Sequence, residues 1–236
     1  MPPTNLFWRT YRPDEGFYTS EVRAPEPLPV RTFLPTGYEP NYAYPLIVFF
    51  HGQGSIEEQV LTLAPRLSRR NYISIALRGP QPVGACDDGR PLFGWGDNNY
   101  DAQIEDYVLN AIKLTRRNYH VHSERIFLAG ICEGAQLAYR FGLQFPEHFG
   151  GIIALNGAMP RQGCPLLRFP EVRQLRVFIG HGNCNAYTPL TAARQDFSLL
   201  YTAGLDVTLQ TYPANHRLHP NMLRDINRWL IAGIDQ

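Results

Sequence analysis

Near its middle the sequence reads Ile126-Phe-Leu-Ala-Gly-Ile-Cys-Glu-Gly-Ala135, an apolar run that leads into the pattern G-x-C-x-G. Gly130 and Gly134 lie two residues on either side of Cys132. This pattern is typical of a nucleophile on a strained turn between a strand and a helix, where the flanking residues must be tiny. The N–H groups that begin the helix favour a thiolate and a developing oxyanion. A lone cysteine is more often a small buried core residue, but the two glycines favour the turn.

Strands and helices alternate along the rest of the chain. Apolar runs typical of buried parallel strands occupy 45–50, 72–77, 125–129, 151–155, 176–179 and 207–212. Segments with apolar residues at helical spacing occupy 56–70, 104–112, 136–145 and 190–202, and a last helix is expected to begin near Pro220. Alternation of this kind predicts an α/β fold with a mostly parallel central sheet and helices on both faces. Ligands of such sheets bind beyond the carboxyl ends of the strands.

The chain is predicted to form one domain over residues 1–236. Residues 1–44 are an extension rich in Pro, Tyr and Arg, with an antiparallel hairpin of two strands over 17–22 and 30–34, and 45–236 form the core that carries the candidate site. The connection 78–98 leaves the end of a core strand and is unusually long. Loops of that length are usually functional or disordered, so we expect a wall of the site, with a mobile surface loop as the alternative.

Composition excludes several classes of function. The formal net charge is +1, which lacks the basic footprint of a protein that binds nucleic acid or an anionic membrane surface. No segment reaches the length of a membrane span, and the first residues do not resemble a secretory signal. The four cysteines are widely spaced, so a cytoplasmic location with free thiols is expected. Their spacing relative to the histidines matches no metal-ligand signature, so neither a metal nor a cofactor is predicted.

Two further motifs accompany the turn at Cys132. Phe50-His-Gly-Gln-Gly54 closes the first core strand, and Tyr212-Pro-Ala-Asn-His216 lies between the last strand and the last helix. His216 is the best candidate for a general base, because it follows a strand end of the predicted sheet. His219 is the competitor, but it lies at the expected start of the helix, where it caps the helix or points to solvent.

Taken in order, the motifs resemble the phospholipase/carboxylesterase branch of the α/β-hydrolase fold, which includes acyl-protein thioesterases and small carboxylesterases. The similarity covers roughly residues 28–233. Its motifs are the H-G-x-G turn, Arg78-Gly-Pro, Gly94-Trp-Gly, G-x-C-x-G, Gly180-His-Gly, His216 and Asp225-Ile-Asn-Arg-Trp-Leu. The cysteine at the turn also resembles that of dienelactone hydrolases. The resemblance implies the α/β-hydrolase fold, the triad order nucleophile, acid, histidine, a small-molecule acyl substrate and, because dimers are common among relatives, a homodimer.

The same resemblance assigns roles around the turn. The backbone N–H groups of Gln53 and Glu133 correspond to the two oxyanion donors, and His51 is more often structural than catalytic in this motif. Relatives carry an aspartate in the pattern H-G-x-x-D-x-x-x-P. The segment here reads His181-Gly-Asn-Cys-Asn-Ala-Tyr-Thr-Pro189, and alignment on its Gly and Pro places Asn185 at the acid position.

The chain therefore departs twice from a Ser-Asp-His set, and Asn156, after the preceding strand, is not an acid either. One interpretation is compensation: a cysteine can exist as a thiolate beside an imidazolium, so its histidine mainly needs orienting, which an amide oxygen can do. Cys132 would then attack an ester, thioester or lactone, with His216 moving the proton and Asn185 orienting His216. The alternative is a decayed site on a protein that only binds a ligand or partner. The intact His216 and the glycines at the turn favour compensation.

The substrate pocket is predicted around His51, Trp95, Tyr100 and Cys184, which fall near the expected strand ends. Trp95 and Tyr100 have the alternative of anchoring the long connection to the core. Cys184 has the alternatives of an ordinary loop residue and of a thiol that resolves an oxidised Cys132. The Glu133 carboxylate disfavours a thiolate beside it, so its side chain either points away, serves as a local base or keeps the thiol protonated.

Overall fold

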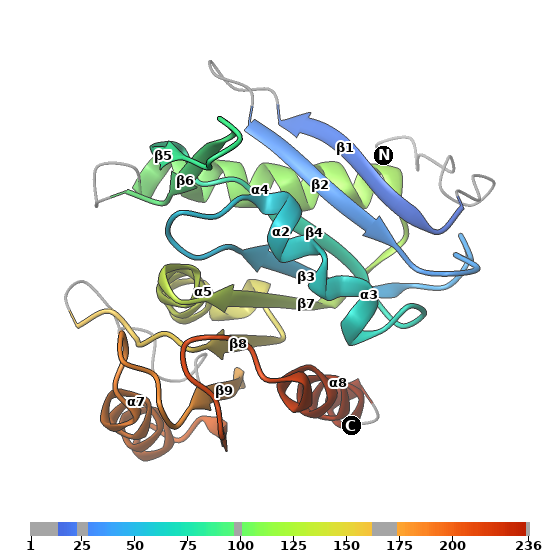
Figure 1. Ribbon diagram of the computed structural model, residues 1–236. Coiled ribbons are helices and arrows are strands. Elements are labelled where there is room, and N and C mark those ends of the chain that lie inside the picture. Colours follow the sequence, from blue (N-terminus) through green and yellow to red (C-terminus); the bar gives the residue numbers. More distant parts are fainter. Residues whose placement is uncertain (1–13, 23–27, 97–100, 162–173, 235–236) are drawn as a thin grey trace.

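A computed structural model describes residues 14–22, 28–96, 101–161 and 174–234 (Figure 1). An eight-stranded sheet runs through it in the order β1-β2-β4-β3-β7-β8-β9-β10. Its strands are β1 (Gly16–Val22), β2 (Leu28–Leu34), β3 (Tyr44–Phe50), β4 (Ile73–Leu77), β7 (Val121–Ile131), β8 (Gly151–Leu155), β9 (Arg176–Gly182) and β10 (Asp206–Tyr212). β2 pairs antiparallel with both β1 and β4, whereas the neighbouring pairs from β4 to β10 are parallel. The predicted α/β-hydrolase fold with antiparallel N-terminal strands is confirmed.

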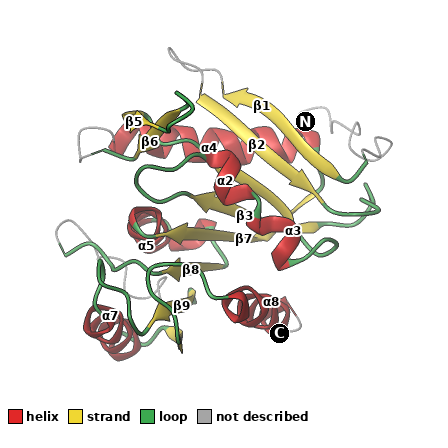
Figure 2. Cartoon of the chain, viewed as in Figure 1, coloured by secondary structure: helices red, strands yellow, loops and turns green. Residues whose placement is uncertain are grey.

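Helices cover both faces of this sheet (Figures 1 and 2). The helices are α2 (Glu57–Leu61), α3 (Leu63–Leu67), α4 (Asp101–Asn118), α5 (Glu133–Gln144), the 3₁₀ turn η2 (Pro146–His148), α7 (Leu190–Thr202) and α8 (Pro220–Ile234). Buried side chains of α4, α5 and α7 join one core cluster, and those of α2, α3 and α8 join the other. Strand β3 supplies both clusters in alternation, as the two-residue period of a strand requires: Leu46, Val48 and Phe50 face the first, and Ile47 and Phe49 the second.

One helix that was predicted to be continuous is interrupted in the structure. The segment 56–70 forms two short helices that meet at Thr62 rather than one. Pro65 lies in the first turn of α3, and it has no N–H to donate to the carbonyl of Leu61. A continuous helix would lose that hydrogen bond, so α2 ends before it.

The long connection 78–98 contains a hairpin that the sequence analysis did not predict. Strands β5 (Gln81–Ala85) and β6 (Pro91–Gly94) pair antiparallel, apart from the main sheet (Figure 2). Gly89 adopts φ +81° at the tip, where the N–H of Cys86 donates to the carbonyl of Arg90 at 2.8 Å. The pair Asp88-Gly89 is a recognised hairpin signal, which was present in the sequence.

The parallel strands place several loops together. The arrowheads of β3, β7 and β8 end on the same side of the molecule (Figure 1), and the loops that follow β3, β7, β9 and β10 carry the residues predicted to form the site. Among the described residues, no helix is both long enough and apolar enough to cross a bilayer.

Candidate functional site

Cys132 lies on the turn that joins β7 to α5. Its backbone angles are φ 56° and ψ −114°, a strained conformation for a residue with a side chain, and its N–H donates to the carbonyl of Leu155 at 2.9 Å. A Cβ on Gly130 would lie 2.0 Å from the carbonyl oxygen of Gly134, and one on Gly134 would lie 2.3 Å from that of Phe50. Both positions therefore exclude side chains, for the reason that the G-x-C-x-G pattern predicted.

His216 and Asn185 are in contact. The Nδ1 atom of His216 lies 3.1 Å from Oδ1 of Asn185, and Asn185 is buried, with 5% of its surface exposed. The same amide oxygen accepts hydrogen bonds from the backbone N–H groups of Tyr187 at 3.1 Å and Thr188 at 3.2 Å. Two backbone donors fix which end of the amide is the oxygen, because the NH₂ group could not accept from them.

This orientation also fixes the protonation of the neutral His216 ring. An amide oxygen can only accept, so Nδ1 must carry the proton that bridges His216 and Asn185. The Nε2 atom then keeps its lone pair. His216 and Cys132 line the same pocket, so the ring has the tautomer that a general base for the thiol requires.

The two predicted oxyanion donors lie at the sulfur of Cys132. The backbone N–H groups of Glu133 and Gln53 both form hydrogen bonds to it that lower its pKa. Two backbone hydrogen bonds join the turn that carries Gln53 to β6. The N–H of Gly54 donates to Phe93 O at 3.0 Å, and the N–H of Phe93 donates to Ser55 O at 3.1 Å. The hairpin therefore holds the turn in place and acts on the site indirectly.

Cys132 and His216 open into a pocket of about 240 Å³. Its other lining residues are His51, Gly52, Gln53, Ser55, Gln59, Val60, Leu63, Ile131 and Leu218. One part of the wall is apolar, from Val60, Leu63, Ile131 and Leu218, and the rest carries amide and hydroxyl groups. A wall of this kind suits a small acyl group beside a polar leaving group.

The electrostatics of the site favour a neutral thiol at rest. Burial raises the pKa of Cys132, and the neighbouring Glu133 carboxylate raises it further, which together outweigh the hydrogen bonds from Glu133 and Gln53. Burial, with a smaller contribution from His181, lowers the pKa of His216. Of the two charge states that the sequence left open, burial therefore favours the neutral pair over a thiolate and an imidazolium, because desolvation penalises both charged forms.

Alkylation of Cys132 by iodoacetamide should consequently rise with pH through a midpoint above that of a free thiol. Only the thiolate reacts, and a raised pKa moves its formation to higher pH. Glu133→Gln removes the nearby negative charge, so the midpoint should fall and the rate at pH 7.5 should rise severalfold, since one pKa unit changes the thiolate fraction about tenfold. Mass-spectrometric rate profiles from pH 6 to 10 measure this. Glu21→Gln, an exposed carboxylate on β1, is the control, and a rate that is already at its plateau at pH 7 would show a preformed ion pair.

The Glu133 side chain lies toward the end of β6. Its Oε2 accepts from the backbone N–H of Trp95 at 3.3 Å, and burial raises the pKa of its carboxyl. The carboxylate is half-buried and close enough to Cys132 to raise the pKa of the thiol. Of the roles left open by the sequence, this placement favours holding the thiol protonated.

The other predicted pocket residues lie in different places. His51 lines the pocket but is fully buried; its Nε2 accepts from Gly79 N at 2.9 Å and its Nδ1 faces Gly52 O at 2.7 Å, so it holds the turn. Trp95 is 1% exposed, and its indole N–H donates to His51 O at 2.9 Å, which matches the alternative of a core anchor. Cys184 is an exposed free thiol on the loop that carries Asn185. Tyr100 is outside the described residues.

Two residues near His216 were missed as site residues. The ring of Tyr187, which is 82% exposed, lies 4.9 Å from that of His216 between centroids. Asn156 is fully buried at the end of β8, and its side chain bonds to the backbone at His216. From the sequence, Asn156 was considered only as a possible acid. The pair Asn156-Gly157 after an apolar strand was the available signal, since asparagine tolerates the left-handed conformation.

Comparisons with known proteins bear on the family and the fold of the chain. The model of the phospholipase/carboxylesterase family matches residues 39–233. Acyl-protein thioesterase 1 of Gibberella zeae is 24% identical over 207 residues, which cover 78% of this chain and 88% of that protein. Acyl-protein thioesterase 1 of Mycosarcoma maydis is 28% identical over 214 residues, with 78% and 89% covered. The crystal structure of a carboxylesterase from Mesorhizobium loti superposes with a TM-score of 0.72 at 19% identity, over 93% of this chain and 99% of that one.

Proposed function

The chain belongs to the phospholipase/carboxylesterase family, and from that membership we propose that it is a cysteine-dependent hydrolase of carboxylic esters, thioesters or lactones. Cys132 is the nucleophile, His216 the general base and acid, and Asn185 the residue that orients His216. The backbone N–H groups of Gln53 and Glu133 hold the oxyanion. No cofactor takes part in this scheme.

The contact between His216 and Asn185 carries the proposal. The oxygen of the buried Asn185 amide receives N–H groups from Tyr187, Thr188 and His216, so the amide is held where it can orient the His216 ring. The same contact leaves the Nε2 lone pair of His216 available in the pocket shared with Cys132. These features support a working proton relay over a protein that only binds a ligand.

The reaction proceeds through an acyl-enzyme. As Sγ of Cys132 bonds to the carbonyl carbon, its proton passes to Nε2 of His216, and the carbonyl oxygen becomes an anion that accepts from Gln53 and Glu133 N–H groups. The intermediate collapses, the C–O or C–S bond of the substrate breaks, and the leaving group takes the proton from Nε2. A water molecule then gives a proton to Nε2 and attacks the thioester, and the Cys132 sulfur leaves and is reprotonated.

A neutral resting pair suits this chemistry because thiol and imidazole are close in acidity. Their ordinary pKa values, about 8.5 and 6.5, differ by about 2 units, so the uphill proton transfer costs only about 2.7 kcal/mol before the site's own shifts. A hydroxyl, with acidity nearer that of water, faces a far larger gap. The uncharged Asn185 is therefore sufficient for cysteine where serine would need a carboxylate.

The size and the apolar wall of the pocket restrict the length of the acyl group that we expect the site to accept. Its volume of about 240 Å³ is below the roughly 300–1,000 Å³ of typical ligand pockets. Its apolar wall is short, since it consists of Val60, Leu63, Ile131 and Leu218. We expect acyl groups of a few carbons to be preferred over long acyl chains.

A panel of acyl compounds tests the proposed function. The purified chain is assayed with p-nitrophenyl acetate, butyrate, octanoate and palmitate, with a short-chain thioester and with an aromatic lactone. Turnover of the short esters, with kcat/KM falling from butyrate to palmitate, is the expected result. A folded chain that turns over no member of the panel would instead support the non-catalytic alternative. The homodimer and the cytoplasmic location implied by the sequence stay predictions.

A further inference from the structure

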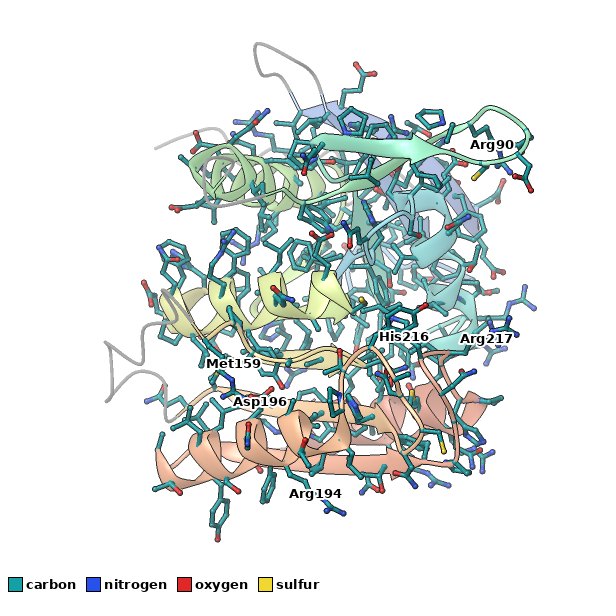
Figure 3. All side chains as sticks on the ribbon, turned by 60° about the vertical axis from the view of Figure 1, so that its left-hand side comes forward. Arg90, Met159, Arg194, Asp196, His216 and Arg217 are labelled. Carbon is teal, nitrogen blue, oxygen red and sulfur yellow. The ribbon has the colours of Figure 1, made fainter. Side chains whose placement is uncertain are left out.

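Asn156 contacts both loops that carry the His216–Asn185 pair. Its Nδ2 donates to the backbone carbonyls of His216 at 3.0 Å and Arg217 at 3.3 Å, two residues that lie side by side on the loop after β10 (Figure 3). Its Oδ1 accepts from the N–H of Gly182 at 2.9 Å, at the start of the loop that carries Asn185. Within the described part of the chain, the hydrogen bonds of this side chain thus go to the backbone that positions the two site residues.

The main chain of Asn156 makes a further contact of the same kind. Its carbonyl oxygen accepts from Nδ2 of Asn185 at 3.4 Å. This bond holds the NH₂ end of the Asn185 amide away from His216, so the oxygen end faces the ring. Asn156 itself has φ +51°, in the left-handed region.

Few residue types could meet these demands together. The backbone needs a residue that tolerates the left-handed region, which favours Gly, Asn and Asp. The side chain must also donate to two carbonyls and accept from one N–H. Among Gly, Asn and Asp, only the amide of asparagine does both. The site is also fully buried, so a missing partner could not be replaced by bulk water.

We propose that Asn156 is a positioning residue whose side chain holds the loop of His216 against the loop of Asn185, and thereby keeps the contact between Asn185 Oδ1 and His216 Nδ1 that sets the tautomer of the His216 ring. The proposal rests on the proposed function for its kinetic consequence, but its structural consequence holds without it. Asn156 is not among the described residues that line the pocket, and its side chain bonds to backbone atoms, so its effect passes through the two residues that it holds.

Two variants separate the parts of this contact. Asn156→Gly keeps the left-handed backbone and removes every side-chain bond, whereas Asn156→Asp keeps the shape and the acceptor for Gly182 but removes the amide donor. In both we expect kcat for p-nitrophenyl butyrate to fall about 10- to 100-fold, the size expected when reacting groups are misplaced by about 1 Å. KM should change less than about threefold. The control is Thr115→Val, which removes a buried hydroxyl bonded to Ala111 O at 2.8 Å in α4, far along the chain from the site.

Nuclear magnetic resonance gives a readout that a loss of stability alone would not move. With ¹⁵N-labelled histidine, the parent chain should show His216 protonated at Nδ1, with a slowly exchanging, low-field Nδ1 proton. The Asn156 variants should lose that proton signal and show mixed tautomers, while Thr115→Val should keep both the signal and kcat.

Two outcomes would overturn the proposal. One is a folded Asn156→Gly variant with the parent tautomer and kcat. The other is unfolding of both Asn156 variants, which would assign the residue to the fold instead of the site. If the parent chain hydrolyses no ester but its Nδ1 signal is present and is lost in Asn156→Gly, the proposed function fails while the positioning role stands.

Discussion

Turnover of p-nitrophenyl butyrate is expected to fall about 10⁴-fold or more when Cys132 is replaced by alanine. The variant keeps the oxyanion donors and the pocket but has no atom to form the acyl-enzyme, and losses of this order follow the removal of a nucleophile. His216→Ala should cost about as much, because without Nε2 the neutral thiol has no acceptor for its proton. The double variant should be hardly worse than either single one, since residues that act as a unit are not additive.

The control for this series is Cys86→Ala, a thiol on the β5–β6 hairpin that should leave kcat/KM unchanged. Initial rates and the melting temperature are measured for each variant, so that a folding defect is recognised. A Cys132→Ala variant that retains more than about a tenth of the parent activity would contradict the assigned nucleophile.

Cys132→Ser alone is expected to be nearly inactive, about 10⁴-fold below the parent chain, because the imidazolium formed from His216 would have no carboxylate beside it. Adding Asn185→Asp should recover about 10²-fold of this loss. The three N–H groups that now reach the Asn185 oxygen would stabilise an ionised aspartate. Recovery should be incomplete, because the second carboxylate oxygen would face the carbonyl of Asn156, now 3.4 Å from Asn185 Nδ2.

A matched control tests whether position or charge alone matters. Asn183→Asp adds the same charge to an exposed residue of the same loop, so combining it with Cys132→Ser should recover nothing. Values of kcat/KM for the four chains decide the matter. Full activity of the single serine variant would show that Asn185 does not compensate for an acid, and the pairing of cysteine with asparagine would lose its explanation.

The fold was largely predictable because its signals are local and repeated. Apolar runs such as 45–50 are typical of strands that are buried on both faces of a parallel sheet, and the glycines around Cys132 follow from backbone clashes across a single turn. The break at Thr62 was missed because helical periodicity is unaffected by Pro65. The β5–β6 hairpin was missed because its strands are mostly exposed and carry little apolar alternation.

Site residues that belong to a motif could be predicted from the sequence, whereas properties that depend on several packed segments could not. The order of motifs indicated Asn185 and His216, 31 residues apart, and they lie in hydrogen-bond contact. The resting charge state stayed open at the level of the sequence, because it depends on how deeply Cys132 and His216 are buried. The network at Asn156 was also out of reach, since three loops from distant parts of the chain must meet before its bonds can be seen.

Trapping the acyl-enzyme tests the central claim most directly. The chain is mixed with p-nitrophenyl butyrate, quenched in acid within the first turnovers and digested, and the peptide that contains Cys132 is examined by mass spectrometry. A butyryl group on Cys132, which forms at the rate of p-nitrophenol release and disappears as substrate is exhausted, is the predicted result. Steady turnover with Cys132 unmodified at every time, or with the acyl group on another residue, would contradict the assignment of Cys132 as the nucleophile.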